Sequence, residues 1–289
     1  MDKTNKIILV TGATGRQGGA TVRHLLAHGW QVRAIARNLA TPAVRALQQA
    51  GAEVVQADND NPASLELAMR GVYGVFSIQP AIFGYETEVR QGKNIAAAAK
   101  AVGIQHFIYT SVGGAEGQSR VRKLGKWEIE QYVQALDLPT TILRPANFME
   151  DIIGPRFGAP NGTFSIALKP DVSLHLIAVD DIGALAALMF ERPDAYLGKI
   201  IEIAGDSLTP PQIAAIISHT TGHSISYVQI PLETIRRQNP DVAQVFYFLN
   251  EIGYQIDIPA LRKLYPNLMS FETWLQKEGK AQFEIVWNS

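Results

Sequence analysis

Three glycines near the start of the chain have the spacing of a phosphate-binding turn. Gly12, Gly15 and Gly18 form a G-x-x-G-x-x-G pattern directly after the apolar run Ile7–Val10. Glycine permits a tight reversal at the first position, close approach of a pyrophosphate at the second, and close helix–strand packing at the third. The N-terminus of the following helix would offer unpaired N–H groups and a positive dipole end to the phosphates. Ordinary loops also contain such glycines, but this position between a strand and a helix predicts a dinucleotide site.

Two arginines bear on which dinucleotide would bind. Arg37 ends the second predicted strand, about 20 residues past the glycines, where NAD sites carry an acidic residue for the ribose 2′-hydroxyl. A guanidinium there could pair with a 2′-phosphate in a bidentate way, and Arg16 could close on that phosphate from the other side. Both could instead be solvated surface arginines. We interpret the pair as favouring NADP(H) over NAD(H).

Polar residues at the ends of further predicted strands extend the candidate site. Asp58 and Asn59 follow the third strand, where the adenine edge would lie, and Gln79 and Pro80 end the fourth. Ligands of parallel sheets bind outside the carboxyl ends of the strands. For all four residues, proximity of the backbone to the cofactor is a simpler expectation than a specific side-chain role.

Lys126 is the candidate catalytic residue. It stands near the start of a helix predicted over 122–136, on the apolar face that packs on the sheet. That face consists of Arg122, Lys126, Ile129, Val133 and Leu136. From there the ammonium group could bind ribose hydroxyls or lower the pKa of a nearby acid. Alternatively, its stem could run along the helix start to water.

Strands and helices alternate through the first half of the chain. The predicted strands cover 7–10, 31–36, 52–57, 73–78, 106–110 and 140–143, the last stopped by Arg144 and Pro145. The predicted helices between them follow the glycine turn and cover 42–50, 62–70, 86–102 and 122–136. Because parallel neighbours need crossover helices, this order predicts an α/β fold with a doubly wound parallel (Rossmann) sheet. By analogy with that fold, the strand order would be 3-2-1-4-5-6.

The pattern changes beyond about Asn147. Turn residues crowd together between 154 and 162, as at a transition to a second lobe. We therefore predict a dinucleotide-binding domain over 1–153 and a smaller C-terminal α+β lobe over 154–289. Residues 179–205 could return to pack on the first domain. The elements predicted here are helices at 181–191 (capped by Asp180), 209–222, 242–248 and 271–276, and strands at 199–204 and 224–230.

Composition limits the class of protein. The 289 residues are 47% hydrophobic and 18% charged, with a formal net charge of -1 and no cysteine. Such a chain offers no basic footprint for nucleic acid or an anionic membrane, and no thiolate for catalysis or metal binding. No apolar run approaches membrane-spanning length, and the polar start leaves no room for a signal peptide. We expect a cytoplasmic monomer or homodimer without a metal site.

Taken together, these motifs resemble the NmrA-like family, atypical members of the short-chain dehydrogenase/reductase superfamily. The matching segments are VTGATGRQGG at 10–19, VRAIARN at 32–38, GAEVVQAD at 51–58 and GKWEIEQY at 125–132. Looser similarity continues through 144–148 and 179–183. The first segment, with its Gln-Gly-Gly ending, looks most like the NADPH-sensing branch of the family.

The resemblance implies an NADP(H) site and a second lobe that closes a cleft over the nicotinamide. The implied site residues are Gly12, Thr14, Gly15, Arg16, Gln17, Gly18 and Arg37, with Asn147 and Phe148 as further candidates in the looser match. Some members reduce quinones, dyes or phenylpropanoids, and a lysine matching Lys126 is the usual candidate for their chemistry. Others bind the cofactor without turnover and report redox state to partner proteins.

One departure from the superfamily favours the second role. None of the nine tyrosines has a lysine four residues later, and Arg122 stands where the catalytic tyrosine would be. The first hypothesis is therefore a redox-state sensor that regulates a protein partner. The alternative is an NADPH-dependent reductase of quinones or similar small electrophiles, using Lys126 without a tyrosine. In a third interpretation, the nucleotide is a structural ligand only.

Overall fold

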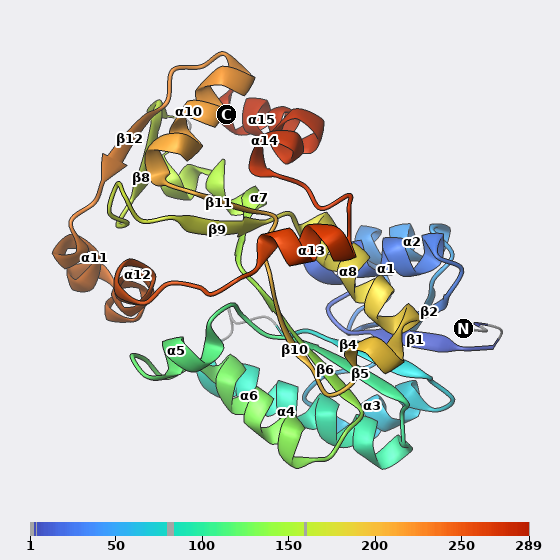
Figure 1. Ribbon diagram of the computed structural model, residues 1–289. Coiled ribbons are helices and arrows are strands. Elements are labelled where there is room, and N and C mark those ends of the chain that lie inside the picture. Colours follow the sequence, from blue (N-terminus) through green and yellow to red (C-terminus); the bar gives the residue numbers. More distant parts are fainter. Residues whose placement is uncertain (1–2, 4, 80–83, 159–160, 289) are drawn as a thin grey trace. The chain divides into compact units, whose positions relative to one another are not determined.

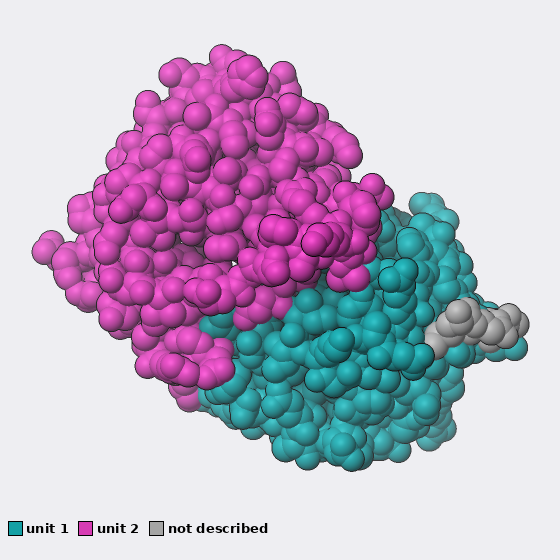
Figure 2. Space-filling model, viewed as in Figure 1, with its two compact units in different colours: residues 1–115, 124–144, 182–201 teal, residues 116–123, 145–181, 202–289 magenta. Residues whose placement is uncertain are grey.

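The computed structural model describes residues 3, 5–79, 84–158 and 161–288. Two compact units make up the chain (Figure 2). Unit 1 comprises Met1–Ala115, Leu124–Arg144 and Ile182–Ile201. Unit 2 comprises Glu116–Lys123, Pro145–Asp181 and Glu202–Ser289.

A seven-stranded sheet dominates unit 1. Its order is β10-β6-β5-β4-β1-β2-β3, which confirms the predicted order of the first six strands. The strands are β1 (Ile7–Val10), β2 (Gln31–Ala36), β3 (Glu53–Gln56), β4 (Gly74–Ser77), β5 (His106–Thr110), β6 (Thr140–Pro145) and β10 (Ile200–Ile203). Neighbours from β3 to β6 pair in parallel. The strand order reverses between β1 and β4, and the carboxyl ends of these two strands are where such sheets bind ligands.

Helices cover both faces of this sheet (Figure 1). Apart from α5 (Ala115–Ser119) and the helix α7 (Met149–Ile152) of unit 2, the helices before β10 are α1 (Arg16–Ala27), α2 (Pro42–Gln49), α3 (Pro62–Met69), α4 (Tyr85–Val102), α6 (Gly125–Ala135), α8 (Val179–Glu191) and α9 (Pro193–Tyr196). Helices α3, α4 and α6 share one buried apolar cluster with the strands, whereas α1 and α8 lie on the opposite face (Figure 1). Gly92 of α4 lies against Ile129 of α6, where a Cβ would approach the Ile129 side chain to 2.5 Å. The small residues of α4 thus permit close helix packing.

Unit 2 has the mixed α+β character expected of the smaller lobe. Its sheets are short: β11-β9-β7 with three strands and β12-β8 with two. Its strands are β7 (Asn147–Phe148), β8 (Thr163–Ile166), β9 (Leu174–Ile177), β11 (Asp206–Leu208) and β12 (Ser226–Gln229). Its helices are α7 (Met149–Ile152), α10 (Pro210–Thr221), α11 (Leu232–Gln238), α12 (Pro240–Glu251), α13 (Ile258–Leu264), α14 (Phe271–Trp274) and α15 (Lys280–Trp287). Within the described residues, no helix combines the length and apolarity needed to cross a membrane.

Local chemistry explains several helix boundaries. Thr209 and Gln212 form a reciprocal capping box at the start of α10, and Gly222 ends that helix with φ +82°, both at the predicted positions. Thr41 and Asn61 cap α2 and α3 by accepting hydrogen bonds from Val44 N and Ser64 N. Each of these caps involves residues within a few positions of one another, so helix boundaries of this kind can be predicted from the sequence.

Three predicted boundaries were wrong. Helix α6 begins at Gly125, because Leu124 is extended (φ -128°, ψ 107°) and separates the helix from a preceding turn. Arg122 belongs to that turn, in which its guanidinium donates to Gln118 Oε1, so it does not share the face of Lys126. Asp180 lies inside α8 rather than capping it, and β6 continues through Pro145.

The close approach of α8 to the α1 backbone at Gly183 gives a stability prediction. A Cβ at Gly183 would lie 2.6 Å from the carbonyl carbon of Ala20. We expect Gly183→Ala to lower the free energy of unfolding by about 1–3 kcal/mol, the usual cost of overpacking, in urea titrations followed by circular dichroism. Gly154→Ala is the control, because Gly154 has φ -80° and its Cβ would stay 3.5 Å from Asp151 O. Equal stability of the two variants would contradict this account.

Candidate functional site

The glycine turn has the geometry that phosphate binding requires. Gly12 has φ +59°, and a Cβ there would meet Ile78 Cγ2 at 2.7 Å. A Cβ at Gly18 would lie 2.2 Å from Gly12 O, so the turn and the helix can approach only without side chains. Gly15 is the N-cap of α1, and no side chain caps this helix. The amides at the start of α1 are therefore not capped by a side chain and can serve a ligand.

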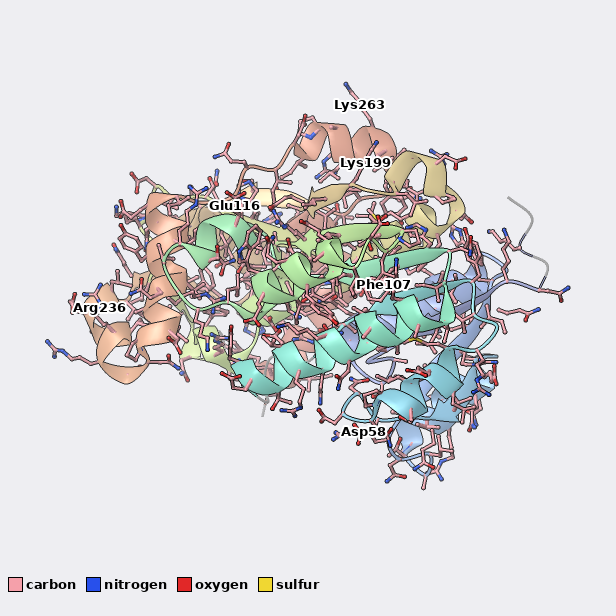
Figure 3. The ribbon with its side chains drawn as sticks, turned by 90° about the horizontal axis from the view of Figure 1, so that it is seen from below. Asp58, Phe107, Glu116, Lys199, Arg236 and Lys263 are labelled. Atoms are coloured by element: carbon pink, nitrogen blue, oxygen red, sulfur yellow. The ribbon has the colours of Figure 1, made fainter. Side chains whose placement is uncertain are left out.

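A cavity of about 160 Å³ opens beside this turn in unit 1. Its lining consists of Gly12, Thr14, Ile35, Ala36, Arg37, Ala57, Asp58, Asn59 and Gln91. A second cavity of about 310 Å³ adjoins it and is lined by Arg37, Gln56, Ala57, Asp58, Asn61 and Ser64. Arg37 and Asp58 line both cavities, and Figure 3 labels Asp58. The structure thus brings together five residues predicted from the sequence: Gly12, Thr14, Arg37, Asp58 and Asn59.

Hydrogen bonds connect the loop after β3 to α4, and the residues that form them were not predicted from the sequence. Asp60 accepts hydrogen bonds from Arg90 Nε (2.8 Å) and Gln91 Nε2 (2.9 Å). These hydrogen bonds hold the pKa of the Asp60 carboxyl below its ordinary value. Asn94 Nδ2 donates to Asn59 O at 3.0 Å. The position of Asn59 in the cavity therefore depends on α4.

The side chains of Thr11, directly after β1, and of Gln17 in α1 form hydrogen bonds to neighbouring strands or their ends. Gln17 is buried, and its side-chain oxygen accepts a hydrogen bond from Thr110 Oγ1 at 2.9 Å. Thr11 Oγ1 donates to Ile78 O (2.9 Å) and accepts from Ile78 N (2.8 Å), which joins the ends of β1 and β4. The Gln17 side chain thus joins α1 to β5. Arg16 is exposed at the first position of α1.

Lys126 is held inside unit 1 instead of extending to water. Its Nζ donates to Gln79 O at 3.1 Å and lies 3.1 Å from Glu88 Oε1. The ammonium also lies 5.9 Å from the centroid of the Tyr109 ring. Only 14% of the Lys126 side chain and 6% of the Glu88 side chain are exposed. A positive charge is thereby fixed beside the carboxyl end of β4.

Several buried polar atoms near this charge have no hydrogen-bond partner among the described residues. They are Gln79 Oε1, Glu88 Oε1, Ser111 Oγ and Tyr109 OH; Glu88 Oε1 lies within ion-pair distance of Lys126 Nζ. Ser77 pairs with Tyr109 between β4 and β5, so Gln79 and Ser111 follow two adjacent strand ends. Burial, with the nearby charges of Glu88 and Glu130, raises the pKa of Tyr109 well above its ordinary value, so this hydroxyl stays protonated. Buried polar atoms without partners are what a polar ligand would satisfy.

Two of the remaining predicted site residues belong to unit 2. Asn147 and Phe148 form β7 of unit 2, where Asn147 Nδ2 donates to His175 O (3.1 Å) and Tyr254 OH (3.4 Å). Pro80 lies outside the described residues. Glu88, Tyr109 and Ser111 were missed, and only Ser111, directly after a predicted strand, carried a signal in the sequence.

The chain is similar to known proteins over most of its length. The model of the NmrA-like family matches residues 4–275. An NmrA-like family domain-containing protein of Dictyostelium discoideum is 29% identical, over 94% of this chain and 98% of its own length. The nitrogen metabolite repression protein nmrA of Emericella nidulans is 27% identical, over 92% of this chain and 76% of its own. The NADPH complex of the Escherichia coli NADPH-dependent quinone oxidoreductase QOR2 has a TM-score of 0.80 and 25% identity, over 96% of this chain and 99% of that one. The chain belongs to the NmrA-like family.

Proposed function

We propose that this protein binds NADP(H), in preference to NAD(H), and acts as a redox-state sensor that regulates a protein partner. The observation that carries the proposal is the cavity in unit 1 shared by the glycine turn and Arg37. The turn presents the uncapped N-terminus of α1 to a pyrophosphate. Arg37 extends into the adjoining cavity, where a guanidinium suits a 2′-phosphate.

The chain's own residues also fit the nicotinamide half of the cofactor. Gln79 Oε1 and Ser111 Oγ are buried without partners among the described residues, and Lys126 Nζ donates to the backbone oxygen of Gln79. Amide and ribose hydroxyl groups would satisfy these atoms. When bound, the reduced nicotinamide supplies a hydride.

The sensor role is favoured over catalysis by what surrounds Lys126. No tyrosine stands four residues before it, and Tyr109, the tyrosine beside it, is fully buried with a raised pKa. A buried phenol with a raised pKa is a poor proton donor. Among the relatives, the Emericella nidulans protein is named for repression rather than for an enzymatic reaction.

A specific observation keeps the reductase as the second candidate. A quinone accepts a hydride with positioning and electrostatic help, so a fixed ammonium and unpartnered polar groups could suffice. The Escherichia coli relative is named for quinone reduction with NADPH. In that case Lys126 would stabilise the charge that develops on the acceptor oxygen.

The amino-acid composition bears on which partners the protein could bind. With a net charge of -1, direct binding to nucleic acid or to a membrane surface has no electrostatic support. We therefore propose a cytoplasmic protein, monomeric or homodimeric, whose partner is a protein for the sensor or a small molecule for the reductase.

The cofactor preference is tested at Arg37. We expect Arg37→Ala to weaken NADPH binding by about 10- to 150-fold, because a charge-assisted pair contributes about 1.5–3 kcal/mol. NADH binding should stay within about twofold, since NADH has no 2′-phosphate. Isothermal titration calorimetry gives both affinities, and Arg45→Ala, an exposed arginine on α2, is the matched control. Equal losses for the two cofactors would overturn the assignment of Arg37.

The role is tested by NADPH oxidation in the presence of quinones, azo dyes and enones, followed by near-ultraviolet absorbance. A sensor should bind NADPH and give no acceptor-dependent oxidation. It should also bind NADPH and NADP⁺ with different affinities, because a ligand shifts a conformational equilibrium only through such a difference.

Steady turnover would replace the sensor with the reductase. Lys126→Ala should then lower the rate by about 100-fold or more, the usual contribution of a positioned acid–base or electrostatic group. Lys123→Ala, an exposed lysine of the preceding turn, should keep the rate. Turnover unchanged in Lys126→Ala would remove this lysine from the mechanism.

A further inference from the structure

Glu88 is an unusual acidic residue, because it is almost fully buried in unit 1. It lies in the first turn of α4, with 6% of its side chain exposed. Its Oε1 atom is 3.1 Å from Lys126 Nζ on α6. A buried carboxylate needs a partner charge, and Lys126 supplies it.

The neighbouring residue on α6 makes room for this carboxylate. A Cβ at Gly125 would lie 2.6 Å from Glu88 Oε2 and 3.3 Å from Val89 Cγ2. Any larger residue at 125 would therefore displace the Glu88 carboxylate. Position 125 requires glycine because a side chain there would occupy the space of the Glu88 carboxylate.

Together, Glu88 and the backbone fix the direction of the Lys126 ammonium. Gln79 O accepts a hydrogen bond from Nζ at 3.1 Å, while Glu88 holds the same atom from α4. Gln79 and Glu88 lie on either side of residues 80–83 in the chain. Lys126 thus ties the end of β4 to the start of α4.

Stability alone does not explain this ion pair. Helices α4 and α6 are already joined by Lys93 and Glu128, whose charged atoms are 2.6 Å apart and whose side chains are 35% and 39% exposed. Gly92 and Ile129 add close apolar packing between the same helices. A buried ion pair is often no more stabilising than apolar side chains of similar volume, so this one calls for another purpose.

We propose that Glu88 is a positioning residue: it aims the Lys126 ammonium at the nicotinamide half of the bound cofactor, and Gly125 provides the space for it. The inference rests on the proposed function, since it presumes that a dinucleotide occupies unit 1. It assigns Glu88 no contact with the adenine half.

The test compares two ligands that share the adenine half. Adenosine 2′,5′-bisphosphate occupies only the Arg37 side, whereas NADPH occupies the whole site. Affinities for both are measured by calorimetry for the natural protein, Glu88→Gln, Lys126→Met and the double variant. Glu53→Gln is the matched control, because Glu53 forms an exposed ion pair with Arg33.

Glu88→Gln should weaken NADPH binding by about tenfold or more, because it leaves the buried Lys126 ammonium without its partner charge. Binding of the bisphosphate should change by less than about twofold. The double variant should lose no more NADPH affinity than Lys126→Met alone, because Glu88 acts only through the lysine. Gly125→Ala should reproduce the Glu88→Gln result by displacing the carboxylate without removing it.

Other outcomes overturn the inference. NADPH affinity that stays within about twofold in both Glu88→Gln and Gly125→Ala would show that Glu88 positions nothing. Additive losses in the double variant, or equal losses for the two ligands, would assign Glu88 a separate or merely structural role. Failure of the natural protein to bind the bisphosphate would instead contradict the proposed function and the inference with it.

Discussion

The site depends on the close passage of backbone at the end of β1. A Cβ at Gly18 would lie 2.2 Å from Gly12 O, so α1 can start this close to the strand only because residue 18 is glycine. Thr11 then fastens this turn to the end of β4 through two hydrogen bonds with Ile78. The start of α1 is thereby held at the strand reversal between β1 and β4, the point at which such sheets bind ligands.

Helix α4 connects the two halves of the candidate site. On the side of the Arg37 cavity, Arg90 and Gln91 hold Asp60 in the loop after β3. On the other side, Glu88 holds Lys126 beside the carboxyl end of β4. The same helix therefore supports both the cavity at Arg37 and the ammonium of Lys126.

The sequence predicted what depends on local patterns. Short, mostly apolar segments predicted six strands of the sheet, and the rule that ligands bind at strand ends singled out the glycine turn, Arg37 and Asp58, which line the cavities of unit 1. Helical periodicity did not reveal the extended Leu124, so Arg122 was placed on the wrong element. Glu88 and Tyr109 belong to the candidate site through their contacts with Lys126, which is far from Glu88 in the chain, so no local sequence pattern indicated them. The three-residue strand β11 of unit 2 is too brief for a periodic signal.

The most direct test of the central claim is a crystal structure of the protein with NADPH. The account predicts the pyrophosphate on the turn from Gly12 to Gly18, the 2′-phosphate against the Arg37 guanidinium, and the nicotinamide half within hydrogen-bonding reach of Lys126. A 2′-phosphate that faces solvent away from Arg37 would contradict the proposed preference for NADP(H). Nucleotide bound away from the glycine turn would contradict the site itself.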